Sequence, residues 1–185
     1  MRFLRGGHGD VSRVYVFVIL DVGTRRMLHW NVTDHPTASW TAQQFRMVVP
    51  GDQPHRFVIH DRDSIYSEGV DRVLQAMGLS VLKTPVRAPQ ANAFCERLIG
   101  TVRHECLDFV ILFNERHLRG VLREWVAHYN RGRPHASLGP GIPDPPLDLL
   151  LTQSSGHRIP ERYRVVAGPV LGGLHHEYRL EPKAA

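Results

Sequence analysis

Residues 14–20 narrow the range of folds open to this chain more than any other segment does. Their sequence, Val-Tyr-Val-Phe-Val-Ile-Leu, is a continuous run of β-branched, aromatic and aliphatic residues without polar alternation. Such a run is typical of a β-strand that is buried on both faces. A sheet with two buried faces needs helices to cover them, so the run predicts an α/β fold.

The segments that follow predict an alternation of strands and helices. Residues 21–26 are predicted to turn the chain into a second strand at 27–33, which makes this pair a hairpin. Further strands are predicted at 56–60 and 79–82, and helices at 36–49, 67–78, 92–107 and 114–129. The last helix has the most complete apolar stripe, made of Leu118, Val121, Leu122, Trp125, Val126 and Tyr129. Residues 1–12 are rich in glycine and are predicted to be a frayed lead-in.

The composition changes at Gly139. Residues 139–146 read Gly-Pro-Gly-Ile-Pro-Asp-Pro-Pro, which is typical of a linker. We therefore expect a core at 1–138 and a Pro/Gly-rich linker with a C-terminal tail at 139–185. That extension is expected to be irregular, although its segment at 165–174 either forms an appended hairpin or docks on a partner.

The charge of the chain favours a polyanionic partner. The net charge is +5 with histidine neutral, and the pI is about 9.7. Residues 83–135 hold nine Lys or Arg residues against five acidic ones. Nearly all cations of the chain are arginines, which bind phosphate oxygens in pairs, although the base composition of the genome explains the same bias.

Several other classes of protein are disfavoured. Cys95 and Cys106 are eleven residues apart on one predicted helix, a separation that excludes a disulfide between them. Neither belongs to a Cys-x-x-Cys pair, so a structural zinc site is not expected. No apolar run approaches the roughly 18 residues of a membrane span, and the amino end lacks a signal-peptide pattern. We expect a cytoplasmic protein without a membrane partner.

Two carboxylates are predicted at the ends of regular elements. Asp61 follows the strand at 56–60, and Glu96 lies near the start of the helix at 92–107. The loop between Lys83 and Ala91 contains two prolines and two cations, so it is predicted to be exposed and mobile. A carboxylate beside such a loop is suited to holding a divalent metal against a phosphate backbone. The alternatives are a strand-end cap for Asp61 and a solvated helix face for Glu96.

Three strings resemble the catalytic core of insertion-sequence transposases and retroviral integrases. They are Ile59-His-Asp-Arg-Asp-Ser64, Pro89-Gln-Ala-Asn-Ala-Phe-Cys-Glu-Arg97 and Tyr129-Asn-Arg-Gly-Arg-Pro-His-Ala-Ser-Leu138. The resemblance covers about Val14 to Leu138. It implies a ribonuclease-H-like fold, in which helices flank a mixed sheet of five strands. It also implies DNA integration or transposition by metal-dependent phosphodiester cleavage and strand transfer, with two Mg²⁺ or Mn²⁺ ions held by an Asp-Asp-Glu triad.

Two members of that triad have matches in this chain. The resemblance makes Asp61 the second triad member and Glu96 the third, and both become candidate catalytic and metal-binding residues. The first aspartate should stand near position 3, where the chain has Arg2, Phe3 and Leu4. Asp10 and Asp21 are weaker candidates, since Asp10 needs a shifted register and Asp21 matches a turn. We therefore expect an incomplete site, a first strand that is incomplete or missing, and a chain that is inactive or nearly inactive by itself.

The resemblance implies DNA as the partner, in the form of transposon ends and target, bound by a homo-oligomer. Candidate DNA contacts are Lys83, Arg87, Asn92, Arg97 and Arg103, with Arg131 and Arg133 as outer phosphate contacts. Two alternatives to an active enzyme remain open. One is a catalytically dead remnant that binds DNA or dimerises, and the other is a host nuclease of the same fold.

Overall fold

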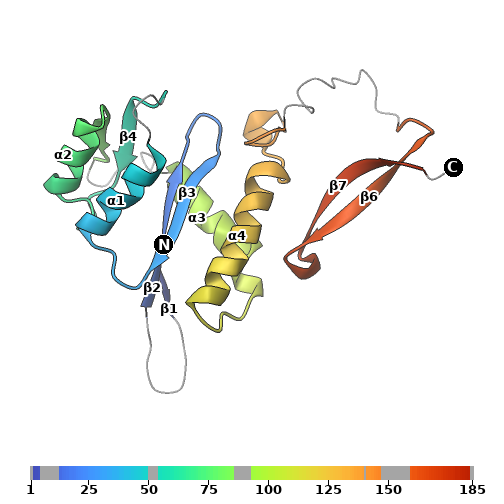
Figure 1. Ribbon diagram of the computed structural model, residues 1–185, viewed down its shortest axis with the longest axis horizontal. Coiled ribbons are helices and arrows are strands. Elements are labelled where there is room, and N and C mark those ends of the chain that lie inside the picture. The colour runs from blue at the N-terminus through green and yellow to red at the C-terminus, as the bar shows by residue number, and fades with distance from the viewer. Residues whose placement is uncertain are drawn as a thin grey trace. The chain divides into compact units, whose positions relative to one another are not determined.

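The computed structural model describes residues 2–4, 13–49, 54–85, 93–139, 141–146 and 159–183 of the 185-residue chain (Figure 1). Its elements are, in order, β1 (Arg2–Leu4), β2 (Arg13–Leu20), β3 (Met27–Thr33), α1 (Ala38–Val48), β4 (Phe57–His60), α2 (Glu68–Ala76), β5 (Ser80–Lys83), α3 (Ala93–Glu105), η2 (Leu107–Phe109), α4 (Glu115–Arg131), η3 (Ala136–Leu138), β6 (Tyr163–Val170), η4 (Leu171–Gly173) and β7 (His175–Pro182). This order confirms the predicted mixture of helices and strands. Within the described ranges, no helix is long and apolar enough to cross a membrane.

The chain divides into two compact units. Unit 1 comprises Met1–Leu20 and Leu28–Glu115, and unit 2 comprises Asp21–Met27 and Arg116–Ala185. Buried apolar side chains occur in both units.

The core of unit 1 forms where β2 packs against helices α1 and α2. Val16 and Phe17 are both buried, and successive residues of a strand point to opposite faces of the sheet. Both faces of β2 are therefore covered, as the apolar run predicted. The ring of Phe17 meets the rings of Trp40 and Phe45 edge-on, at centroid distances of 5.6 and 5.7 Å. The buried hydrophobic residues that pack together in this core are Phe17, Ala42, Phe45, Val70, Leu74 and Leu79.

The strands of unit 1 pair in two groups. The order β1-β2-β3 makes one sheet, and β4 pairs with β5 in parallel, with Ile59 opposite Leu82. We expected one sheet of five strands, and the pairing of the described residues does not show it. β4 and β5 are four residues long, and Phe57, Ile59 and Leu82 on one face remain exposed. Helix α2 connects these two strands, so Asp61 and the loop after Lys83 leave the pair at the same end.

Residues 2–4 form a strand, which corrects the expectation of a frayed lead-in. β1 pairs antiparallel with β2, and Phe3 lies opposite Val14. The partner strand is the most strongly apolar segment of the chain, and pairing with it satisfies the backbone of a short segment. The glycines at positions 6, 7 and 9 obscured this pairing at the sequence level.

Helix α4 is the centre of unit 2. Its buried residues include all six members of the predicted apolar stripe, and the side chain of Trp125 is completely buried. The ring of Tyr129 lies 5.0 Å from the ring of Trp125, centre to centre. The stripe predicted from spacing is therefore confirmed.

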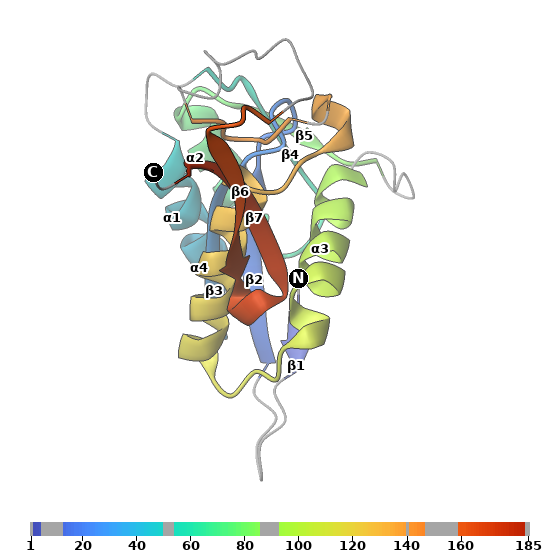
Figure 2. The same cartoon turned by 90° about the vertical axis from the view of Figure 1, so that its right-hand side faces the viewer.

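The C-terminal extension contains an antiparallel hairpin, so it is not irregular throughout. β6 and β7 pair over their whole length, from Tyr163 opposite Pro182 to Val170 opposite His175 (Figure 2). Of the two alternatives for the tail, the structure supports the hairpin. Its inner face meets α4, because the Nδ1 atom of His128 lies 2.8 Å from a carboxylate oxygen of Glu177.

Candidate functional site

Asp61 lies where β4 ends, directly after His60, and its side chain is exposed. The carboxylate oxygen Oδ1 accepts a hydrogen bond from the backbone N–H of Asp63 at 3.1 Å. This bond closes an Asx-type turn that holds the side chain locally. No described residue bonds to the other oxygen, Oδ2, which therefore remains available for a ligand.

Glu96 lies in the first turn of α3, and its side chain is exposed. The helix starts at Ala93 and buries Leu98 and Val102 on the opposite stripe. The carboxylate is thus held on a helix and presented to solvent.

Both carboxylates act on the thiol of Cys95. Burial is the main reason that the pKa of Cys95 is raised, and the negative charges of Asp61 and then Glu96 raise it further. Burial also raises the pKa of Tyr66, followed by the charges of Asp61, Cys95 and Asp63. Coulomb interactions weaken with distance, so Asp61 and Glu96 lie within electrostatic reach of one half-buried thiol. The charge of Asp61 therefore reaches the thiol of the residue that directly precedes Glu96.

A third carboxylate does not join this pair in the described residues. The strand β1 occupies the expected position of the first aspartate, and its residues Arg2, Phe3 and Leu4 carry no carboxylate. The Oδ1 atom of Asp21 accepts bonds from the backbone N–H groups of Gly23 at 2.8 Å and Thr24 at 3.4 Å, so Asp21 caps the turn after β2. Asp10 lies outside the described residues.

The donor set decides which metal could bind. Among the described residues, no group of three or more His, Cys, Asp or Glu side chains is arranged to hold a metal ion. Two carboxylates fit one hard divalent cation such as Mg²⁺, which usually keeps several waters and takes one or two protein carboxylates. They do not fit a pair of metal ions, because no further carboxylate among the described residues joins them to bridge the two.

The structure gives Lys83 a partner inside the protein. Its Nζ atom lies 2.6 Å from the Oδ2 atom of Asp71 on α2, and the Nε2 atom of His60 lies 2.9 Å from Oδ1 of the same carboxylate. Desolvation raises the pKa of Asp71, but hydrogen bonds from Lys83 and His60 outweigh it, so the net shift is downward. Sequence reasoning assigned Lys83 to DNA and gave His60 no role. A histidine at the last position of a strand, beside a candidate ligand, was the available signal.

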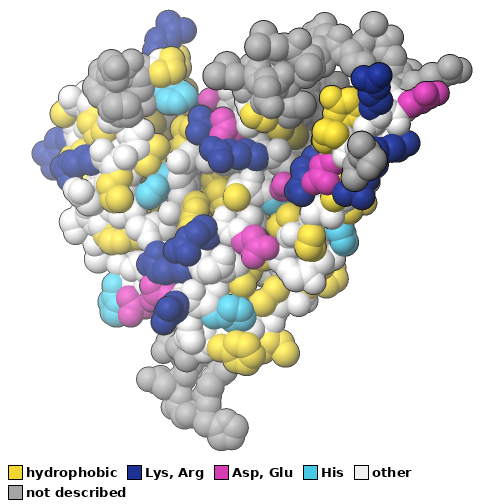
Figure 3. Space-filling view, turned by 45° about the vertical axis from the view of Figure 1, so that its right-hand side comes forward, with side chains coloured by type: hydrophobic (Ala, Val, Ile, Leu, Met, Phe, Trp, Pro, Cys, Tyr) yellow, Lys and Arg dark blue, Asp and Glu magenta, His cyan; other side chains and the backbone are white. Residues whose placement is uncertain are grey.

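The other cations predicted to contact DNA differ in their surroundings. Arg97 and Arg103 are exposed on α3, and Arg103 Nε lies 3.4 Å from an oxygen of Asp108. Arg87 and Asn92 lie outside the described residues. On the face shown in Figure 3, basic side chains lie in several groups with acidic side chains beside them. Exposed arginines on α3 are thus compatible with phosphate contact, while part of the positive charge is already balanced.

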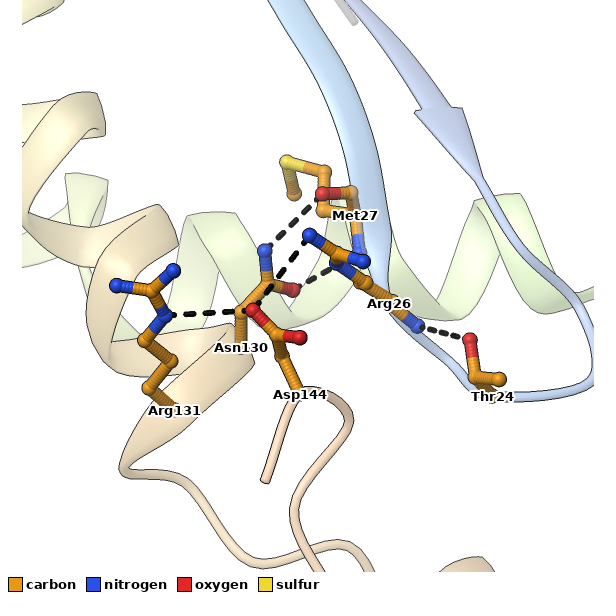
Figure 4. A network of polar contacts seen from close by, with 6 residues as sticks. All are labelled: Thr24, Arg26, Met27, Asn130, Arg131 and Asp144. Atoms are coloured by element: carbon orange, nitrogen blue, oxygen red, sulfur yellow. Dashed lines mark hydrogen bonds and ion pairs between the residues drawn. The ribbon is translucent and has the colours of Figure 1, made fainter. Parts of the chain in front are cut away.

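Arg131 belongs to a polar network within unit 2 (Figure 4). Its Nε atom and the Nη2 atom of Arg26 both meet Oδ2 of Asp144, at 3.3 and 3.5 Å. Asn130 donates to the backbone oxygen of Met27 at 3.0 Å and accepts from the Met27 N–H at 2.9 Å. We call Arg26, Met27, Asn130, Arg131 and Asp144 the clasp.

Other residues of the motif at 129–138 also contact nearby residues of the protein. The guanidinium of Arg133 lies 6.0 Å from the centre of the Tyr129 ring, within cation–π range. The ring of His135 meets the same ring edge-on at 4.8 Å, and the backbone of His135 donates to the Gly141 oxygen. The segment that most strongly suggested the family therefore includes residues that tie the end of α4 to its surroundings.

Comparison with known proteins places these residues in context. Residues 77–143 match the family model of the integrase core domain. The putative transposase InsD for insertion element IS2E of Escherichia coli (strain K12) is 28% identical over 139 residues, which cover 69% of this chain and 62% of that protein. The transposase InsD for insertion element IS2A/D/F/H/I/K of Escherichia coli is also 28% identical over 139 residues, covering 69% of this chain and 45% of that protein. The chain spans about half the length of the curated relatives that it matches.

A similar fold occurs in a solved structure. A chain of the cryo-electron-microscopy structure of the simian T-cell lymphotropic virus intasome in complex with PP2A regulatory subunit B56 gamma superposes with a TM-score of 0.53. The alignment covers 98% of this chain and 65% of that chain, with 12% sequence identity. At this identity the likeness concerns the fold alone.

Proposed function

We propose, from the premise that this chain contains an integrase or transposase catalytic core, that it acts in DNA transposition and binds one divalent cation through Asp61 and Glu96. The fold that we propose for the core is ribonuclease-H-like. The cation would be Mg²⁺ or Mn²⁺, and the substrate would be transposon ends and target DNA in the cytoplasm, bound by a homo-oligomer.

One observation carries the proposal. Asp61 and Glu96 come from different elements, and the charge of Asp61 reaches the thiol of Cys95, the residue directly before Glu96. Both side chains are exposed, so their desolvation does not oppose ion binding. When bound, a hard cation would supply charge stabilisation to a phosphate backbone. The protein's own contribution is to hold the two carboxylates on a strand end and a helix start.

Catalysis by this chain alone is not part of the proposal. A symmetric two-metal arrangement needs more carboxylates than Asp61 and Glu96 provide, and β1 supplies none. We therefore infer that the isolated chain binds metal and DNA but cleaves DNA slowly or not at all. The second candidate function, a non-catalytic remnant that binds DNA or dimerises, is favoured by the same missing carboxylate.

DNA contact is proposed for Arg97 and Arg103 on α3, and for Arg87 and Asn92 in the preceding segment. Both α3 arginines are exposed on the helix that carries Glu96. Lys83, Arg131 and Arg133 have partners within the protein, so their contribution to phosphate binding is expected to be smaller.

Metal binding tests the proposal directly. Mn²⁺ is titrated into the full chain, and the free ion is followed by electron paramagnetic resonance. We expect one binding event that Asp61→Asn and Glu96→Gln each weaken by about tenfold or more, because a ligand oxygen is replaced by a neutral amide. Glu68→Gln is the matched control, since Glu68 is also an exposed glutamate in the first turn of a helix.

Two results would overturn parts of this proposal. Mn²⁺ binding that is absent, or equally sensitive to Glu68→Gln, would remove the Asp61–Glu96 site. Metal-dependent strand transfer by the native chain that is abolished by Asp61→Asn would show that the site is complete and that a third ligand exists.

A further inference from the structure

The ends of β4 and β5 are joined by a polar cluster in which His60 and Asp71 are buried and Lys83 is partly exposed. His60 and Lys83 are the last residues of the two strands and lie opposite each other in the parallel pair. Asp71 reaches both from α2, with contacts of 2.9 Å to His60 Nε2 and 2.6 Å to Lys83 Nζ. The side chain of His60 is 2% exposed, so this imidazole is almost completely removed from water.

The imidazole of His60 also reaches forward along its own chain. Its Nδ1 atom lies 2.6 Å from the backbone oxygen of Asp61. A carbonyl oxygen can only accept a hydrogen bond, so Nδ1 is the donor in this contact. The Nε2 atom lies 2.9 Å from the Asp71 carboxylate. The two ring nitrogens therefore contact different parts of the site, Nδ1 the Asp61 backbone and Nε2 the Asp71 side chain.

The ring of Tyr66 fixes the plane of the imidazole. The two rings are stacked at a centroid distance of 4.4 Å, with 13° between their planes. An imidazole held by two hydrogen bonds and one stacked ring has little freedom to rotate. Its Nδ1–H therefore points steadily at the Asp61 oxygen.

The backbone oxygen of Asp61 controls where the chain goes next. Its position sets the ψ angle of Asp61, and ψ determines the course of residues 62 and 63. The N–H of Asp63 then holds the Asp61 carboxylate through Oδ1 at 3.1 Å. A second link at this point runs from Arg62 Nε to the Thr84 oxygen at 3.2 Å. Hydrogen bonds and the backbone of residues 61–63 thus link the buried imidazole of His60 to the exposed carboxylate of Asp61 without a gap.

We infer that His60 is a positioning residue, which orients the Asp61 carboxylate by holding the Asp61 backbone oxygen through its Nδ1–H. The role of that carboxylate as a metal ligand rests on the proposed function, whereas the hydrogen-bonded geometry does not. The bond to Asp71 anchors the ring to the fold, and the bond to Asp61 transmits the ring's position to the site.

Two amide substitutions separate these contacts. The side-chain nitrogen of asparagine occupies the place of Nδ1, and that of glutamine occupies the place of Nε2. His60→Asn therefore keeps a donor for the Asp61 oxygen and loses the bond to Asp71. His60→Gln keeps the bond to Asp71 and loses the donor for Asp61. Each full-length variant is compared with the native chain.

The first readout is amide hydrogen exchange at Asp63, measured by NMR, because this N–H bonds to the Asp61 carboxylate. We expect His60→Gln to speed exchange at Asp63 by roughly tenfold, and His60→Asn to change it by less than about threefold, since a lost hydrogen bond of about 1 to 1.5 kcal/mol corresponds to that factor. The second readout is Mn²⁺ affinity, which His60→Gln should weaken by about 10-fold or more, as outer partners of metal ligands do.

A purely structural role predicts a different pattern. Both readouts would then follow the overall stability of the two variants, measured by urea unfolding, and His60→Asn would be affected as much as His60→Gln. Native exchange at Asp63 in His60→Gln would also overturn the inference. If His60→Gln does not fold, Tyr66→Leu frees the ring from one side, and unchanged exchange at Asp63 in that variant counts against the inference.

The experiments distinguish failure of the proposed metal site from failure of the positioning role of His60. If the native chain binds no Mn²⁺, or Asp61→Asn leaves binding intact, the metal site is refuted. The exchange rate of the Asp63 amide still decides whether His60 orients the Asp61 side chain.

Discussion

Asn130 and Asp61 are both polar residues at the end of a regular element, but their side chains have different surroundings. The Asn130 amide is bonded to the protein, and the Asp61 carboxylate is exposed to solvent. Both polar atoms of the Asn130 amide bond to the backbone of Met27, a residue 103 positions earlier. The Asp61 carboxylate is exposed and bonds to a backbone N–H two residues away. In unit 2, the polar groups of the clasp bond to one another. In unit 1, the side chains of Asp61 and Glu96 are exposed to solvent.

This difference between the two regions assigns them different roles: the clasp contributes to stability, and the Asp61–Glu96 pair is available for ligand binding. A polar group whose partner is buried contributes to stability mainly because its loss would leave that partner unsatisfied. An exposed carboxylate contributes little to stability and is free to take a ligand. Substitutions in the clasp should therefore change unfolding, and substitutions in the Asp61–Glu96 pair should change binding.

Removal of the Asn130 amide should have the largest effect. Asn130→Ala leaves the N–H and the oxygen of Met27 without these partners, and Met27 is buried. We expect the free energy of unfolding to fall by about 2 to 4 kcal/mol, the cost of two unsatisfied buried backbone groups. Urea unfolding at neutral pH measures the change.

The control for this substitution is Gln75→Ala, which removes an exposed amide from α2 and should cost less than about 0.5 kcal/mol. Glu96→Gln should likewise leave unfolding almost unchanged. A loss below about 1 kcal/mol for Asn130→Ala would mean that water replaces the clasp, and the contrast between the two regions would disappear.

A second effect should come from Asp71, which resembles the clasp although it lies in unit 1. Hydrogen bonds from Lys83 and His60 overcome desolvation and lower its pKa in the folded state. A group with a lowered folded pKa stabilises the protein above its unfolded pKa, which is about 4 for aspartate. That contribution is lost as the pH falls below 4 through the lowered value.

We expect Asp71→Asn to cost about 2 kcal/mol at pH 7, in the range of hydrogen bonds to charged groups. The native chain and this variant should converge in stability as the pH falls toward 2. Urea unfolding between pH 2 and pH 7 tests this, and a difference that is constant over that range would assign the lost stability to packing instead.

Spacing and apolar runs predicted most of the elements, because these signals are local. The run at 14–20 and the stripe of α4 depend on residues a few positions apart, and burial of Val16, Phe17 and Trp125 confirms both. The strand β1 was missed because its stability comes from pairing with Val14 and its neighbours, which no local pattern reveals.

The polar contacts of the site were harder to predict than the elements. Asp61 and Glu96 could be proposed from position and resemblance, and their metal role stays a prediction. Lys83 and Arg131 were assigned to DNA from their charge and from the resemblance. Their partners, Asp71 and Asp144, lie 12 and 13 residues away in sequence and come close only in the folded chain. Charge in a sequence does not reveal which cations are already paired.

The smallest effect should distinguish arginines that are open to DNA from those held by the protein. Each phosphate contact that is lost reduces the slope of log affinity against log salt by about 0.9 for duplex DNA. Arg97→Gln should reduce the slope by about that amount, because Arg97 is exposed on the helix of Glu96. Arg103→Gln should reduce it less, since Asp108 lies 3.4 Å from its Nε atom.

Arg131→Gln is the contrasting variant, and it should change the slope least of the three. The carboxylate partner of Arg131 is Asp144, which is held in place by two further contacts. Its side chain also meets Arg26, and its backbone N–H donates to the backbone oxygen of Asn130 at 2.9 Å. Fluorescence anisotropy with a labelled duplex between 50 and 200 mM salt, a range in which each phosphate contact changes the affinity measurably, provides the slopes. Equal slope changes for Arg97→Gln and Arg131→Gln would place the clasp at the DNA surface as well, and the division between a paired region and an open one would no longer hold.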